Sequence, residues 1–83
     1  MEGSSDAVEK NLADISKKFQ KYRKSGKMTQ EEVASAAGIS RSSLARFESG
    51  RHNPTLEGLL KIADAMGYRV EIRFVKKGSA PRD

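Results

Sequence analysis

Apolar residues near the start of the chain are separated by alternating steps of four and three positions. The five residues with this spacing are Val8, Leu12, Ile15, Phe19 and Tyr22. Such steps place side chains on one face of an α-helix, so the pattern predicts a helix over residues 6–24. Asp6 and Glu9 have the spacing of a capping box at its start. The small, polar residues 1–5 are expected to form a flexible N-terminus.

Residues 29–50 predict two short helices joined by a tight turn. Thr29 and Glu32 have capping-box spacing at the start of the first helix. The small apolar face that follows consists of Val33, Ala36 and Ala37. Gly38 comes next, where glycine readily adopts the positive φ angle that ends many helices. Ser40 can then cap the second helix.

The second of these helices has an apolar side and a polar side. Leu44 and Phe47 are three positions apart and are expected to be buried, and Gly50 ends the helix. The residues expected to face outward are Arg41, Ser42, Ser43, Ala45 and Arg46. This face contains two arginines and no acidic residue before Glu48.

After residue 50 the sequence predicts one more helix, and after Gly67 the spacing of apolar residues changes from helical to alternating. Thr55 can cap a helix over residues 56–66, which Gly67 ends. Its apolar face consists of Leu56, Leu59, Leu60, Ile62, Ala63 and Met66. From residue 68 onward, charged residues alternate with an apolar set made of Tyr68, Val70, Ile72 and Phe74. This alternation predicts a β-strand over residues 68–75, followed by a flexible basic tail over residues 76–83.

The predicted strand has no partner strand within the chain. Because a single strand leaves its backbone groups unpaired, we expect it to pair antiparallel with a second copy, through the apolar set of residues 68–74. An irregular tail folded on the core is the alternative. If Glu71 faced Glu71 of the second copy, Arg69 of one copy would face Arg73 of the other, and like charges would meet. We therefore expect a shifted register, in which Glu71 faces Arg69 or Arg73 of the second copy.

Length, charge and residue types narrow the function classes. The chain has 83 residues, a formal net charge of +5 and no cysteine. It can form one small domain, with residues 6–67 as its helical part, and its charge suits a polyanionic partner. The lack of cysteine excludes disulfides, zinc fingers and thiol catalysis. Without a long apolar run we expect no membrane partner and a cytoplasmic location, nucleoid-associated when bound to DNA.

The two helices joined at Gly38 predict a helix-turn-helix, whose second helix can lie in the DNA major groove. Arginine can bond guanine through two hydrogen bonds, and serine can bond bases or phosphates. The outward face of residues 41–46 therefore suits DNA. An ordinary helical hairpin with a solvated basic face is the alternative interpretation.

No enzymatic activity, metal site or cofactor is expected. His52 is the only histidine and has no second metal ligand at useful spacing. The serines lack the histidine and acid partners that nucleophilic catalysis needs. Neither a pair of carboxylates nor a phosphate-binding glycine loop is recognisable.

Residues 28–67 resemble the Cro/C1-type (XRE) helix-turn-helix family. The matching segments are TQEEVA, AGIS and SSLARFESGRHNPTLEGLLKIADAMG. The resemblance implies a mainly α, lambda-repressor-like bundle of four to five helices. In this chain the predicted C-terminal β-strand, pairing across a homodimer, takes the place of the last element of the family.

The resemblance also implies roles for individual residues. The base-contacting positions of the recognition helix are Arg41, Ser42 and Arg46. The positions expected to contact DNA phosphates are Gln30, Ser40, Ser43, Arg51 and Asn53. Arg23 and Glu48 match a buried ion pair of the family, so Glu48 is expected to be structural.

A domain of this family followed by a C-terminal strand is similar to the HipB-like and HigA-like antitoxins of type II toxin–antitoxin operons. This resemblance implies an autorepressor that binds a pseudo-palindromic operator as a homodimer, with a kinase-like or ribonuclease-like toxin as a second partner. A phage-like or stand-alone repressor without a toxin is the main alternative. A module that chiefly binds a toxin and an architectural, non-specific DNA binder are the other classes.

Overall fold

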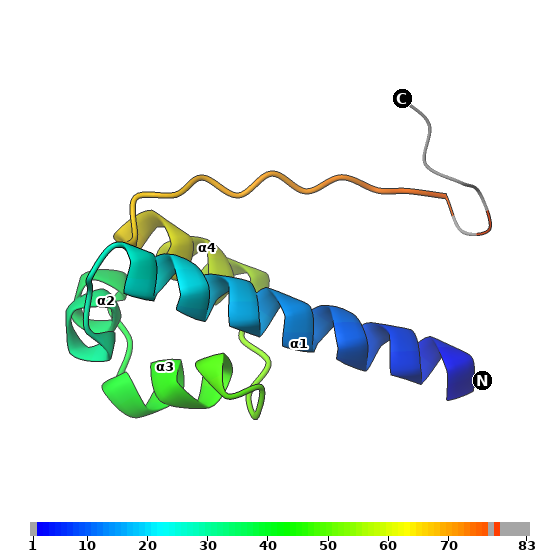
Figure 1. The fold of residues 1–83 in the computed structure, drawn as a ribbon, viewed down its shortest axis with the longest axis horizontal. Coiled ribbons are helices and arrows are strands. Elements are labelled where there is room, and N and C mark those ends of the chain that lie inside the picture. The colour runs from blue at the N-terminus through cyan, green and yellow to red at the C-terminus, as the bar shows by residue number, and fades with distance from the viewer. Residues whose placement is uncertain (1, 77, 79–83) are drawn as a thin grey trace.

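The computed structural model describes residues 2–76 and 78, which contain four helices (Figure 1). They are α1 (Glu2–Ser25), α2 (Gln30–Ala37), α3 (Arg41–Glu48) and α4 (Leu56–Ala65). The three short helices gather around the C-terminal half of α1, and its N-terminal half extends past them. None of these helices is long and apolar enough to cross a membrane.

The helices α2 and α3 begin and end through local hydrogen bonds. Thr29 and Glu32 form a complete capping box, because each side chain accepts a hydrogen bond from the other residue's backbone N–H, at 3.0 and 2.9 Å. Gly38 ends α2 with a φ of 75°, in the left-handed region. Ser40 Oγ accepts the Ser43 N–H at 3.1 Å and caps α3. These caps confirm the predicted starts of the two helices.

The core lies where α2, α3 and α4 meet the C-terminal half of α1. Its buried apolar residues are Val33, Ala34, Ala37, Leu44, Phe47, Ile62, Ala63 and Met66. From α1, Phe19 packs edge-on against Phe47, with the ring centroids 5.2 Å apart. Ala36 was expected in the core but is exposed, and Ala34 is buried instead. Helix α2 packs against both α3 and α4, and the face that these two helices cover contains Val33, Ala34 and Ala37.

Helix α1 begins earlier and is less covered than its sequence pattern predicts. It starts at Glu2, so residues 2–5 are helical and Asp6 lies within the helix instead of capping it. Val8 and Ile15 belong to the predicted apolar face, yet they are 56% and 36% exposed. The other helices pack against the C-terminal half of α1, where Phe19 and Tyr22 are half-buried.

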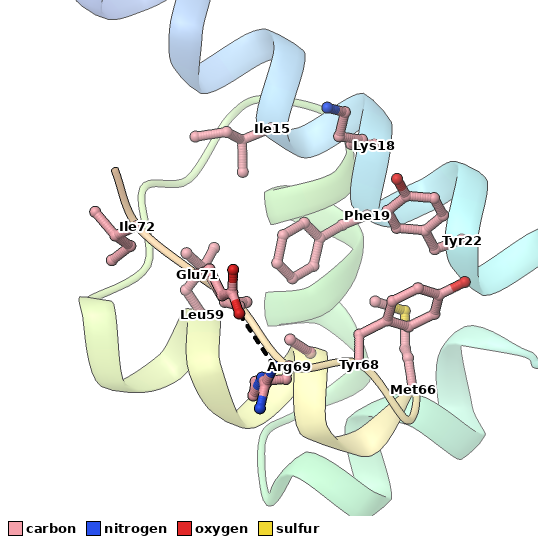
Figure 2. Close-up of a pocket in the computed structure, with 12 residues that line it drawn as sticks. Ile15, Lys18, Phe19, Tyr22, Leu59, Met66, Tyr68, Arg69, Glu71 and Ile72 are labelled. Carbon is pink, nitrogen blue, oxygen red and sulfur yellow. Dashed lines mark hydrogen bonds and ion pairs between the residues drawn. The ribbon is translucent and has the colours of Figure 1, made fainter. Parts of the chain in front are cut away.

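Residues 68–75 do not form the predicted β-strand, and the described residues contain no strand at all. The segment is extended (Figure 1). A strand requires a second strand for its backbone hydrogen bonds, and residues 2–76 supply none. Its start is anchored, because Tyr68 stacks on Tyr22 with ring centroids 4.6 Å apart and planes 14° apart (Figure 2). Most of the predicted tail over residues 76–83 lies outside the described residues.

Candidate DNA interface

Helix α3 presents a polar face opposite the core. Arg41, Ser42 and Arg46 are exposed, whereas Leu44 and Phe47 on the other side are buried. Within the described part of the chain, neither guanidinium group forms an ion pair with a carboxylate. Both arginines are therefore available to an external acceptor such as a guanine edge or a phosphate.

The three serines at the start of α3 contact one another. The Ser40 hydroxyl donates to Ser43 Oγ at 3.0 Å, and Ser42 Oγ lies 3.3 Å from Ser40 Oγ. Because Ser40 Oγ also accepts the Ser43 N–H, its main role in the free protein is to cap the helix. A phosphate contact by Ser40 would have to use the proton that it now donates to Ser43.

The loop after α3 carries two more of the predicted phosphate contacts, Arg51 and Asn53. Gly50 has a φ of 80°, and the Arg51 N–H bonds the Arg46 carbonyl at 2.9 Å. This tight turn places the loop directly after the C-terminus of α3. Arg51 and Asn53 are both exposed there.

Arg23 and Glu48, expected as a structural pair, form a two-point ion pair. Arg23 Nε donates to Glu48 Oε2 at 2.7 Å and Nη2 donates to Oε1 at 2.9 Å. A third nitrogen, Nη1, donates to the Met28 carbonyl at 2.8 Å. The residues are only 8% and 6% exposed. The hydrogen bond to Glu48 raises the pKa of Arg23, burial opposes this, and the Glu48 charge adds to it. The pair thereby joins α1 to α3.

Gln30, the predicted phosphate contact of α2, also contacts this pair. Its Nε2 donates to Glu48 Oε1 at 3.0 Å, and the residue is half-buried. The sequence does not predict this bond, because its partners are 18 positions apart and lie on two helices whose packing local spacing does not specify.

The matched family model is the HTH_3 helix-turn-helix family, and it covers residues 19–72. This match extends over more than half of the chain and includes all of α2, α3 and α4. The chain belongs to the HTH_3 family. This confirms the Cro/C1-type (XRE) family that the sequence predicts.

Several transcriptional regulators and repressors are similar to this chain in sequence. An uncharacterized HTH-type transcriptional regulator of Methanocaldococcus jannaschii is 34% identical over 70% of this chain and 88% of the relative. The cryptic phage CTXphi transcriptional repressor RstR of Vibrio cholerae and the immunity repressor protein of Bacillus phage phi105 are both 39% identical, over 69% and 68% of this chain. The chain matches only 51% and 39% of these two repressors.

A solved structure supports the fold of this HTH_3 domain. The restriction-modification controller protein C.AhdI from Aeromonas hydrophila superimposes with a TM-score of 0.69 at 27% identity. The alignment covers 71% of this chain and 89% of C.AhdI. The mainly α, four-helix part of the predicted fold is thereby confirmed. The predicted C-terminal strand and the resemblance to antitoxins are not.

Proposed function

We propose that this protein is a sequence-specific DNA-binding transcriptional repressor that acts as a homodimer. The observation that carries the proposal is the exposed face of α3, where Arg41, Ser42 and Arg46 project from a helix whose other side is buried. Two relatives that share this domain are named as repressors, which supports the same role here.

In this proposal α3 enters the major groove and occupation of the promoter prevents transcription, without any chemical step. Arg41, Ser42 and Arg46 contact bases, and a bidentate arginine on guanine is the strongest of these contacts. The phosphate contacts come from Gln30, Ser40, Ser43, Arg51 and Asn53. They supply affinity and its dependence on salt, but little choice of sequence.

The proposed homodimer is supported by the C-terminal segment. Ile72 and Phe74 are 58% and 92% exposed, which is unusual for large apolar side chains. Tyr68 and Val70 of the same segment line a groove of ≈ 570 Å³ between α1 and α4 (Figure 2). A second copy that paired antiparallel with residues 68–75 would bury the exposed side chains and bond the free backbone groups. The two recognition helices would then read half-sites about 34 Å apart on a pseudo-palindrome.

The proposal is tested by selecting duplexes from a random-sequence pool with the full chain. The most enriched duplex and a scrambled duplex of equal composition are then compared by fluorescence anisotropy across a salt series. We expect a preference of about 10³-fold or more and a steep decrease of affinity with salt. Equal binding of both duplexes would instead identify an architectural, non-specific DNA binder.

The antitoxin role is a narrower prediction within this proposal. The relatives compared above have names that concern regulation, repression and control of restriction-modification. Copurification of this chain with a kinase-like or ribonuclease-like protein encoded by a neighbouring gene would establish an antitoxin. Operator binding without such a partner would identify a stand-alone repressor.

A further inference from the structure

We infer that Glu48 positions the Gln30 side chain for its contact with a DNA phosphate, besides pairing with Arg23. The inference rests on the proposed DNA-binding function. Its basis is one shared atom: Glu48 Oε1 accepts hydrogen bonds from Arg23 Nη2 at 2.9 Å and from Gln30 Nε2 at 3.0 Å. Three helices, α1, α2 and α3, contribute one side chain each to this cluster.

The cluster selects one orientation of the Gln30 amide. Both carboxylate oxygens of Glu48 accept hydrogen bonds from the Arg23 guanidinium, so Oε1 also acts as an acceptor toward Gln30. The amide must therefore turn Nε2 toward Glu48, because the opposite orientation would bring two acceptor oxygens together. One N–H of Nε2 is used by Glu48, and among the side chains and backbone groups of residues 8–76 no acceptor takes the other. That second N–H is the group we assign to the phosphate.

The cluster also restricts the side chain before DNA arrives. A free glutamine side chain has several rotatable bonds, and ordering them on binding lowers affinity. Gln30 is half-buried and anchored at its end, so much of this ordering is already present in the free protein. Because Glu48 is the last residue of α3, the amide is also held in register with the recognition helix.

The test compares phosphate contacts in three folded variants on the duplex preferred by the wild type. The variants are Gln30→Ala, the double variant Arg23→Met with Glu48→Met, and the triple variant that combines all three substitutions. Replacing a buried ion pair by apolar residues of similar size often leaves stability intact, so the double variant isolates the loss of the anchor. Ethylation interference reports which phosphates each protein needs.

We expect Gln30→Ala and the double variant to lose the same phosphate contact, while the other contacts persist. Each should bind about tenfold more weakly, as expected for one hydrogen bond to a charged group. The triple variant should bind the duplex no more than about twice as weakly as either of the other two variants, because both changes remove the same phosphate contact. The inference would be overturned if the double variant kept this phosphate contact at wild-type strength, or if it weakened all phosphate contacts equally.

Two further measurements test the inference without the double variant, and the second of them uses only the wild-type protein. Glu48→Gln keeps the side-chain size and allows the Gln30 amide to turn, so it should lose the same phosphate contact. In the free wild-type protein, NMR relaxation should show a more rigid side-chain amide at Gln30 than at the exposed Asn53. Equal mobility of the two amides would overturn the inference without DNA. Failure to select any preferred duplex would count against the proposed function alone.

Discussion

At the scale of the residue, burial divides the charged side chains of α3 into two groups. Arg41 and Arg46 are exposed on the outer face, and Glu48 is 6% exposed beside Arg23. Exposed arginines keep their hydrogen-bond donors for a partner, whereas a buried carboxylate must have its partners inside the protein. Substitutions in the two groups should therefore affect different measurements.

Arg41→Ala should weaken binding to the preferred duplex by about 1–3 kcal/mol and to a scrambled duplex much less, because only the former loses a base contact. Anisotropy titrations of both duplexes measure this difference. Lys61→Ala is the matched control, since it removes one positive charge from α4 instead of α3. If the two duplexes lost equal affinity, Arg41 would be a phosphate contact that reads no base.

Glu48→Ala should lower the free energy of unfolding by about 3–5 kcal/mol, because it leaves the Arg23 guanidinium buried without its carboxylate. Urea denaturation measures the change. Glu57→Ala provides the comparison, since it removes an exposed partner of Lys61, with side chains 76% and 56% exposed, and should change stability by less than about 1 kcal/mol. Similar effects of the two substitutions would show that the buried pair contributes little to stability.

At the scale of the element, the turn between α2 and α3 sets how the recognition helix is presented. Gly38 has a φ of 75°, and its N–H bonds the Ser35 carbonyl at 3.2 Å. Two residues later Ser40 caps α3, which begins at Arg41. The angle between the two helices thus depends on a backbone conformation that residues with a Cβ rarely adopt.

Gly38→Ala should lower the free energy of unfolding by about 1–2 kcal/mol through backbone strain alone, because no atom lies within 4 Å of the added Cβ. Gly26→Ala is the control. Its Cβ would make ordinary contacts, the nearest being the Tyr22 carbonyl oxygen at 3.5 Å, and stability should change by less than about 0.5 kcal/mol. Chemical denaturation of both variants measures the contrast, and equal losses would argue against strain at Gly38.

At the scale of the whole molecule, exposed apolar residues are concentrated away from α3. They occur on α1, on α4 and in the C-terminal segment, at Val8, Ile15, Leu56, Leu60, Tyr68, Ile72, Phe74 and Val75. The proposed DNA-facing side and these exposed apolar residues therefore belong to different elements. That separation allows the proposed second copy to bind without covering Arg41 or Arg46.

The double substitution Ile72→Asp with Phe74→Asp should convert dimers into monomers that remain folded, because both side chains are exposed in the single chain. Binding to the full operator should weaken about 10²–10⁴-fold, since two half-sites are no longer linked. Sedimentation and anisotropy measure the two effects. Lys76→Asp is the control for added negative charge. A variant that stayed dimeric would place the interface on α1 or α4.

Spacing in the sequence determined the features that depend on residues close together in the chain. The caps at Thr29 and Ser40 join groups three positions apart, and the positive φ of Gly38 follows from the turn between two helical patterns. The polar face of α3 follows from the helical period. The pairing of Arg23 with Glu48 came from the family resemblance and not from spacing. The DNA-contact roles of individual residues stay predictions.

Only the tertiary structure decided which elements meet. It buried Ala34 instead of Ala36, because α2 lies against two helices, and it left Val8 exposed where no helix covers α1. It brought Gln30 of α2 into hydrogen-bond contact with Glu48 of α3, and the residue spacing within either helix does not predict this contact. The alternation after Gly67 predicted a strand, but a strand exists only where another backbone accepts its hydrogen bonds. The described residues offer no such backbone, so residues 68–75 remain extended, and at their start the Tyr68 N–H bonds the Ala63 carbonyl of α4 at 2.9 Å.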